Sequence, residues 1–180
     1  MTKLASKRLQ FEPPCPADAP ALAAALNDFT VAKNLATAPH PYGEQDASAF
    51  IQKVTEGRAR GEAYCFVLRR KTGGQLVGCT GLHLHSGFYE LGYWIAKPFW
   101  RQGFATEAAG RLLQFAFDDL QAAEVWAGWY HDNAISGRVL STHGFTADHV
   151  EKQYSLARGE NVLCNRARLT AADFRRKKAA

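Results

Sequence analysis

The amino-acid sequence predicts an α/β (α+β) fold, a single domain in which a mixed, mostly antiparallel sheet of about seven strands is flanked by about four helices. Two observations support this prediction. Strand-like and helix-like patterns follow one another in the order β-α-α-β-β-β-α-β-α-β-β. The three successive strand patterns in the middle are joined by short connections with turn residues, which favours antiparallel pairing there.

The first third of the chain predicts one strand and two helices. Residues 7–14 alternate in polarity and end on two prolines, as a strand does. Residues 16–28 and 44–57 carry apolar side chains at helical spacing. Between them, residues 34–43 contain two prolines and a glycine, so we expect an irregular loop.

The remainder predicts an antiparallel meander of three strands, a long helix, a strand, a short helix and two closing strands. These segments are 63–70, 75–85, 89–95, 104–120, 124–130, 132–144, 145–150 and 162–169. The long helix has a wide apolar stripe of period 3.6, so one of its faces should be buried. No linker or repeat divides the chain, which predicts one domain over 1–174 and a basic C-terminal tail over 175–180.

Composition narrows the class of protein. The net charge of +5 suits an anionic ligand, but part of the excess lies in the basic tail, and direct nucleic-acid binding is not expected from charge alone. The N-terminus has no apolar signal segment, and no apolar run is long enough to span a bilayer. None of the four cysteines forms a CxxC pair, which favours reduced thiols in a cytoplasmic protein.

One stretch, KPFWRQGFATEAAG (97–110), predicts an anion site at the start of the long helix. The first amides of a helix lack carbonyl partners and carry a partial positive charge. Gly103 lets a ligand approach the backbone, and Arg101 adds a charge. The phosphate-binding patterns GxxxxGK[ST] and GxGxxG are absent. The local sequence leaves open that Gly103 only begins a core helix.

Two motifs together resemble the GNAT acyltransferase superfamily, and most closely its Rim-type branch of ribosomal-protein N-terminal alanine acetyltransferases. They are ELGYWIAKPFWRQGFATEA (90–108) and DNAISGRVLSTHGF (132–145). The family pattern Q/R-x-x-G-x-G/A reads here from Trp100 to Ala105, with tryptophan at the first position. The resemblance covers nearly the whole chain and implies a sheet that is splayed at the strand before the long helix.

The resemblance also implies acetyl-CoA as cofactor. Its pyrophosphate is expected on the amides of residues 102–105, and its pantetheine arm beside the strand that ends at 94–96, paired much like an added strand. Asn133 would bind the pantetheine arm, although an N-cap role favours the same residue type. The expected cofactor-binding residues are Trp94, Ile95, Ala96, Arg101, Gln102, Gly103, Phe104, Ala105, Thr106, Asn133 and Ser136.

The catalytic residues follow from the same resemblance. Many GNAT enzymes have a tyrosine seven residues after the asparagine, where it protonates the leaving thiolate, but this chain has Leu140 there. A serine at i+3 is the replacement in Rim-type enzymes, so Ser136 is the candidate general acid; it could instead be a small residue at a helix–cofactor contact. Glu90 is the candidate base, acting through water, with an exposed strand-end carboxylate as the alternative. Asp148 and His149 are further candidates for the base.

The acceptor is expected to be a primary amine, either a protein N-terminal α-amine or a small molecule. By resemblance, His40 and Tyr42 in the loop between the first two helices contact it; turn chemistry is the alternative. A metal site is not expected, because His83 and His85 have no third ligand at a fixed spacing. A non-catalytic acyl-CoA-binding sensor is the second functional hypothesis, and a homodimer is compatible with either.

Overall fold

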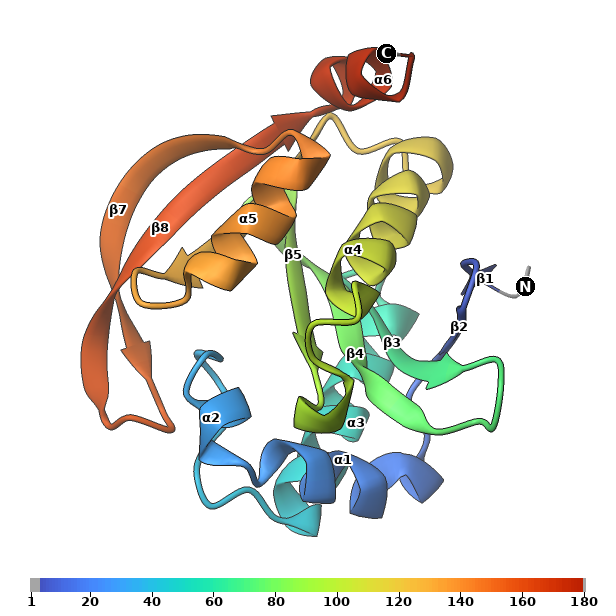
Figure 1. The fold of residues 1–180 in the computed structure, drawn as a ribbon, viewed down its shortest axis with the longest axis vertical. Coiled ribbons are helices and arrows are strands. Elements are labelled where there is room, and N and C mark those ends of the chain that lie inside the picture. Colours follow the sequence, from blue (N-terminus) through green and yellow to red (C-terminus); the bar gives the residue numbers. More distant parts are fainter. Residues whose placement is uncertain (1–3, 180) are drawn as a thin grey trace.

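The computed structural model describes residues 4–179, whose strands form one sheet in the order β1-β2-β3-β4-β5-β6-β8-β7 (Figure 1). Every neighbouring pair is antiparallel except β5 and β6, which are parallel. The predicted mixed, mostly antiparallel sheet is therefore confirmed. The strands are β1 (Leu4–Ala5), β2 (Leu9–Glu12), β3 (Ala63–Arg70), β4 (Leu76–His85), β5 (Phe88–Ile95), β6 (Glu124–Tyr130), β7 (Thr146–Ser155) and β8 (Glu160–Thr170).

Six α-helices connect or flank these strands. They are α1 (Ala19–Leu26), α2 (Phe29–Ala32), α3 (Glu44–Ala59), α4 (Phe104–Gln114), α5 (Ala134–His143) and α6 (Ala171–Ala179). The long helix that was predicted to reach residue 120 changes after Gln114 into a π-helical turn over Phe115–Asp119. The two-residue β1 and the one-turn α2 were too short to be predicted from periodicity.

The helix α6 crosses the boundary expected between the domain and a basic tail. Thr170 and Asp173 exchange hydrogen bonds at its start, and Phe174 is buried against the ring of Phe117, with centroids 4.8 Å apart. The basic residues therefore lie on a helix that one aromatic side chain anchors to the core.

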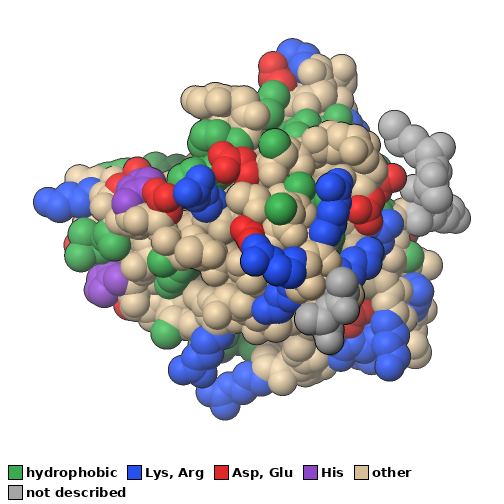
Figure 2. Space-filling model, turned by 90° about the horizontal axis from the view of Figure 1, so that it is seen from above, with side chains coloured by type: hydrophobic (Ala, Val, Ile, Leu, Met, Phe, Trp, Pro, Cys, Tyr) green, Lys and Arg blue, Asp and Glu red, His purple; other side chains and the backbone are tan. Residues whose placement is uncertain are grey.

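On the face shown in Figure 2, Lys and Arg side chains lie in separate groups with Asp and Glu among them.

The sheet has a separate hydrophobic core on each face, because successive side chains of a strand point to opposite faces. On β3, Phe66 and Leu68 belong to the core under α4 and α5, whereas Val67 belongs to the core under α1 and α3. In Figure 1, α4 and α5 lie side by side on the near face of the sheet. Cys65, Cys79 and Cys164 are buried free thiols, as predicted.

The sheet opens between β5 and β6. The two strands pair only where Tyr89–Leu91 faces Val125–Ala127, yet β5 continues to Ile95 and β6 to Tyr130. The expected splay is thus confirmed, and it lies directly before the segment that leads to α4. None of the helices in the described part of the chain is long and apolar enough to cross a membrane.

Candidate active site

The loop before α4 turns sharply and presents the start of the helix. Arg101 and Gly103 both have left-handed backbone angles, with φ of 59° and 77°. A glycine adopts this conformation without steric cost, whereas an arginine does not. The first-turn amides of residues 104–106 have no helical carbonyl before them. Local geometry therefore produces a cradle of N–H groups at the start of α4, where the anion site is expected.

Arg8 in the turn between β1 and β2 braces this cradle. Its Nη1 donates to the Gln102 carbonyl at 2.9 Å, its Nε to Glu107 Oε2 at 2.6 Å, and its guanidinium carbon lies 4.3 Å from the centroid of the Phe104 ring. Arg8 and Glu107 were not predicted as site residues, because they are 99 residues apart and no local pattern links them. The one feature of the sequence that could have pointed to Glu107 is its acidic side chain in the first turn of the helix.

Glu107 is held ionised by these contacts. Burial alone would raise the pKa of its carboxyl group, but hydrogen bonds from the Arg8 backbone, the Ser6 hydroxyl and the Arg8 side chain lower it below its ordinary value. A negative charge in the first turn is also favourable at a helix N-terminus. The pair thus fixes the first turn of α4 to the start of the chain.

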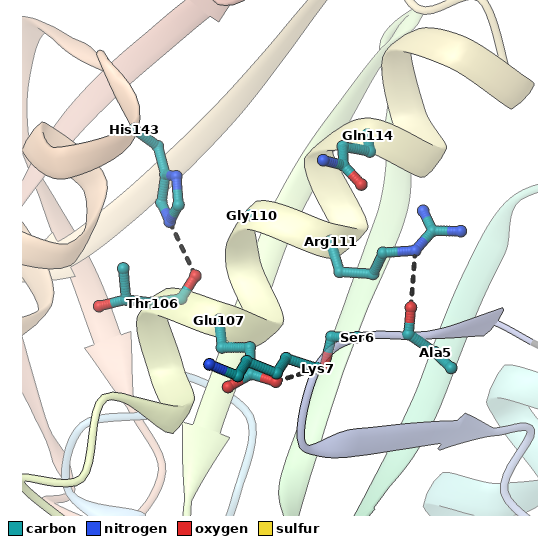
Figure 3. Close-up of a pocket in the computed structure, with 9 residues that line it drawn as sticks. All are labelled: Ala5, Ser6, Lys7, Thr106, Glu107, Gly110, Arg111, Gln114 and His143. Carbon is teal, nitrogen blue, oxygen red and sulfur yellow. Dashed lines mark hydrogen bonds between the residues drawn. The ribbon is translucent and has the colours of Figure 1, made fainter. Parts of the chain in front are cut away.

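A shallow depression of about 470 Å³ adjoins the cradle along α4 (Figure 3). His143 at the end of α5 lies 2.9 Å from the Thr106 carbonyl through its Nε2, and Arg111 donates to the Ala5 carbonyl at 3.1 Å. Burial lowers the pKa of His143, which keeps the ring neutral. Thr106, a predicted cofactor residue, therefore lies at the border between the cradle and the contact of α4 with α5.

Trp100, the residue that departs from the family pattern, caps the end of β5. Its indole Nε1 donates to the Ile95 carbonyl at 2.6 Å, and Ala96 N donates to the Val77 carbonyl at 2.8 Å. The side chains of Ile95 and Ala96 are buried, so this strand end can offer a ligand only backbone groups. Trp94 is half-buried and packs against the core under α1 and α3.

Asn133 and Ser136 lie at the start of α5. The Asn133 Oδ1 accepts a hydrogen bond from Ser136 N at 3.3 Å, so the N-cap role expected for Asn133 is confirmed. The Ser136 hydroxyl lies 2.9 Å from the Tyr93 hydroxyl on β5. Leu140, seven positions after Asn133, is 1% exposed and packs in the core.

Glu90 lies in β5 and forms an ion pair. Its Oε1 accepts from Arg166 Nη1 at 2.6 Å, and Arg166 Nε lies 3.4 Å from Glu151 Oε1. Burial would lower the pKa of Arg166, but the carboxylates raise it above its ordinary value. Gly128 permits this arrangement, because a Cβ there would lie 2.7 Å from Arg166 Nη1.

The other two candidate bases lie beside this ion pair. His149 is paired with Arg166 across β7 and β8. Asp148 Oδ2 is 2.8 Å from His149 Nδ1, and Asp148 Oδ1 is 3.5 Å from Arg168 Nε. The structure therefore gathers Glu90, Asp148 and His149 around arginine side chains on neighbouring strands.

The two predicted acceptor contacts differ in exposure. His40 is exposed and its ring packs against Phe29, with centroids 5.3 Å apart. Tyr42 is 5% exposed in the core under α1 and α3, and its backbone N donates to Asn27 Oδ1 at 3.0 Å. Burial raises the pKa of Tyr42 to about 12. These facts favour a structural role for Tyr42 over the expected contact with an acceptor.

His83 is half-buried and contacts a cysteine. Its Nε2 is 3.3 Å from Cys65 Sγ, and burial lowers its pKa. Among residues 4–178, no group of three His, Cys, Asp or Glu side chains could hold a metal ion.

The comparisons with known proteins agree with this geometry. A family model described as an acetyltransferase (GNAT) domain matches residues 8–146. A Bacillus licheniformis protein named "Uncharacterized N-acetyltransferase p20" is 26% identical over 163 residues, which cover 89% of this chain and 88% of that protein. The Bacillus subtilis protein "Uncharacterized N-acetyltransferase YoaA" is 30% identical over 95 residues, which cover 51% of this chain and about half, 54%, of the relative.

Among solved structures, the chain is similar in fold to RimL, a ribosomal L7/L12 alpha-N-protein acetyltransferase in complex with coenzyme A. The TM-score is 0.80 at 16% identity, and the match covers 93% of this chain and 97% of the other.

Proposed function

Because the chain belongs to the GNAT acetyltransferase family, we propose that it is an N-acetyltransferase that transfers acetyl to a primary amine directly, in a ternary complex. Acetyltransferases of this family use acetyl-CoA, which supplies the acetyl group as an activated thioester. The rest of the proposal concerns what the residues of this chain do.

The proposal rests on one observation: the sheet opens between β5 and β6 close to the N–H groups at the start of α4. Beyond Leu91, β5 has no partner strand on its β6 side. The first residue of α4 follows nine positions after Ile95, the last residue of β5, whose carbonyl accepts from Trp100 Nε1. Unpaired strand groups bind an extended chain by strand addition, and a helix N-terminus binds phosphate. Residues 94–96 and 101–106 therefore suit an extended arm that ends in a pyrophosphate, with Asn133 and Ser136 across the opening.

The proposed roles are Ser136 as the acid that protonates the leaving sulfur and Glu90 as the base that takes the proton of the amine through water. The ion pair with Arg166 Nη1, at 2.6 Å, fixes the position of the Glu90 carboxylate. His149 and Asp148 on β7 are the alternatives. Most of the rate acceleration is expected from positioning, because a thiol leaves readily.

The proposed acceptor is a protein N-terminal α-amine or a small amine. The activity in the name of RimL suggests the N-terminal class of acceptor. The proposed contact with the acceptor is the loop that contains His40. Carboxylates of Glu90 and Glu151 beside the opening would favour the approach of a cationic amine. We propose a cytoplasmic location, where acetyl-CoA and such acceptors are found together.

The test is release of free thiol from acetyl-CoA with a panel of peptides that begin with Ala or Ser, the same peptides with blocked N-termini, tyramine and spermidine. We expect release only with free amines, and a lower kcat in Ser136→Ala and Glu90→Gln. Coenzyme A at about 100 times its dissociation constant should raise stability by about 2.7 kcal/mol. Absence of both the stabilisation and the release would refute the proposal.

A non-catalytic acyl-CoA sensor is the second candidate. It is favoured by the arginine that occupies one oxygen of Glu90 and by the core position of Leu140, which leaves no tyrosine at the usual place. Stabilisation by coenzyme A without acceptor-dependent thiol release would support this candidate over the enzyme.

A further inference from the structure

Tyr93 on β5 reaches across to the first turn of α5. Its hydroxyl lies 2.9 Å from Ser136 Oγ and 3.2 Å from the Ser136 carbonyl oxygen. The two residues are 43 positions apart, and Tyr93 is partly buried against the core under α4 and α5. Tyrosine is the only standard residue that carries a hydroxyl at the end of so long a side chain.

The direction of this hydrogen bond decides what Ser136 can do. A serine hydroxyl has one hydrogen to donate and two lone pairs that accept. If Ser136 donates to Tyr93, its hydrogen is not available to a ligand. If Tyr93 donates to Ser136, the serine hydrogen is free to point into the opening between β5 and β6.

The surroundings favour Tyr93 as the donor. Burial raises the pKa of Tyr93 to about 12, although the contact with Ser136 opposes part of that rise. The phenol therefore keeps its hydrogen over the physiological range, and both oxygens near it, Ser136 Oγ and the Ser136 carbonyl, can accept. A buried hydroxyl hydrogen without an acceptor would cost free energy, so Tyr93 is expected to donate to one of them. Ser136 Oγ is the nearer acceptor, at 2.9 Å against 3.2 Å for the carbonyl, and we take it as the partner.

We propose that Tyr93 is a positioning residue that orients the Ser136 hydroxyl toward the leaving sulfur. This inference rests on the proposed function. In the step, the amine nitrogen forms the C–N bond as the thioester C–S bond breaks, the base takes a proton from nitrogen, and sulfur takes the proton of Ser136. Solvent then returns a proton to Ser136, while Tyr93 keeps its own throughout.

The kinetic test compares Tyr93→Phe with Tyr89→Phe, using the free-amine peptide that wild type acetylates fastest. Tyr89 is a matched control: it lies on the same strand and face, and its hydroxyl donates to a backbone carbonyl, that of Gly61, at 3.5 Å. Loss of one hydrogen bond predicts a kcat about 3- to 10-fold lower in Tyr93→Phe, with KM for acetyl-CoA unchanged. Tyr89→Phe should keep the wild-type kcat.

A double mutant separates positioning from packing. If Tyr93 acts only through Ser136, the Tyr93→Phe change should have no further effect on kcat in the Ser136→Ala background. A loss of the same size in both backgrounds would mean that the phenol acts by packing alone, and would overturn the proposal.

Two readouts do not depend on activity. Coenzyme A should stabilise Tyr93→Phe as much as wild type in thermal unfolding. In protein labelled with ¹³C at tyrosine Cζ, the resonance missing from Tyr93→Phe identifies Tyr93, and it should shift in Ser136→Ala. An unshifted resonance would show that the hydrogen bond is absent in solution. Wild type without any amine-dependent release would refute the proposed function, whereas an active wild type with a fully active Tyr93→Phe refutes only the role of Tyr93.

Discussion

Gly103 has a left-handed φ of 77°, which glycine adopts without steric cost. A Cβ there would make only an ordinary contact, 3.5 Å from Arg8 Nη2. A residue with a side chain in this conformation costs about 1–2 kcal/mol. The resulting turn is what brings the first amides of α4 to the surface.

Gly103→Ala should therefore lower the free energy of unfolding by about 1 kcal/mol and also weaken coenzyme A binding. The measurements are urea unfolding and thermal shift with coenzyme A. Gly74→Ala is the control: its φ is 65° and nothing lies within 4 Å of the added Cβ. It should lose similar stability but keep the full coenzyme A shift. Equal shifts in the two variants would argue against a ligand at the cradle.

At the scale of elements, α4 and α5 meet closely at Gly110. A Cβ at Gly110 would lie 2.9 Å from Cε1 of His143, whose ring is held by its contact with the Thr106 carbonyl (Figure 3). Glycine in the middle of a helix normally costs about 1 kcal/mol relative to alanine. The residue at this position is therefore a poor helix former, and its lack of a side chain is what permits the close contact with α5.

This contact predicts that Gly110→Ala changes the free energy of unfolding in opposite directions in wild type and in the His143→Ala background. Gly110→Ala should destabilise wild type, because the His143 ring must leave the Thr106 carbonyl. In the His143→Ala background the same change should stabilise by about 1 kcal/mol. Chemical unfolding of the four proteins of this cycle measures both values. Stabilisation in both backgrounds would mean that the ring moves aside without cost.

At the scale of the whole molecule, the β7–β8 hairpin closes back onto the loop after α2 (Figure 1). Arg158 donates to both oxygens of Asp132 at 2.9 and 3.0 Å and to the Lys33 carbonyl at 2.8 Å, and Leu156 N donates to the Ala36 carbonyl at 3.1 Å. Three distant parts of the chain are thereby joined on the side where the acceptor is expected.

Arg158→Ala should lower the free energy of unfolding by about 1 kcal/mol, because it removes the hydrogen bond to the Lys33 carbonyl and a bidentate ion pair between a mostly buried arginine and an exposed aspartate. It should also raise KM for the acceptor while leaving coenzyme A binding unchanged. Arg60→Ala is the matched control, since its ion pair with Glu62 is exposed and should contribute almost nothing. An unchanged acceptor KM in Arg158→Ala would separate the hairpin from the acceptor site.

The sequence by itself determined the fold class, the order of the longer elements and the local geometry at the starts of α4 and α5. Helices and strands follow from local periodicity, and the cradle and the Asn133–Ser136 cap each lie within a few residues of chain. Their chemistry is local, so a short motif contains it. The helix α6 was not predicted, because it is anchored by a contact between Phe174 and the distant Phe117.

Only the tertiary structure decided which distant side chains meet. The pairs Arg8–Glu107, Tyr93–Ser136 and Glu90–Arg166 are 99, 43 and 76 residues apart. Periodicity assigns a residue to a face of its element but carries no information about its partner on another element. The irregular loop around Tyr42 lacks even that periodicity, so its burial could not be read from the sequence: packing against α1 and α3 decided it.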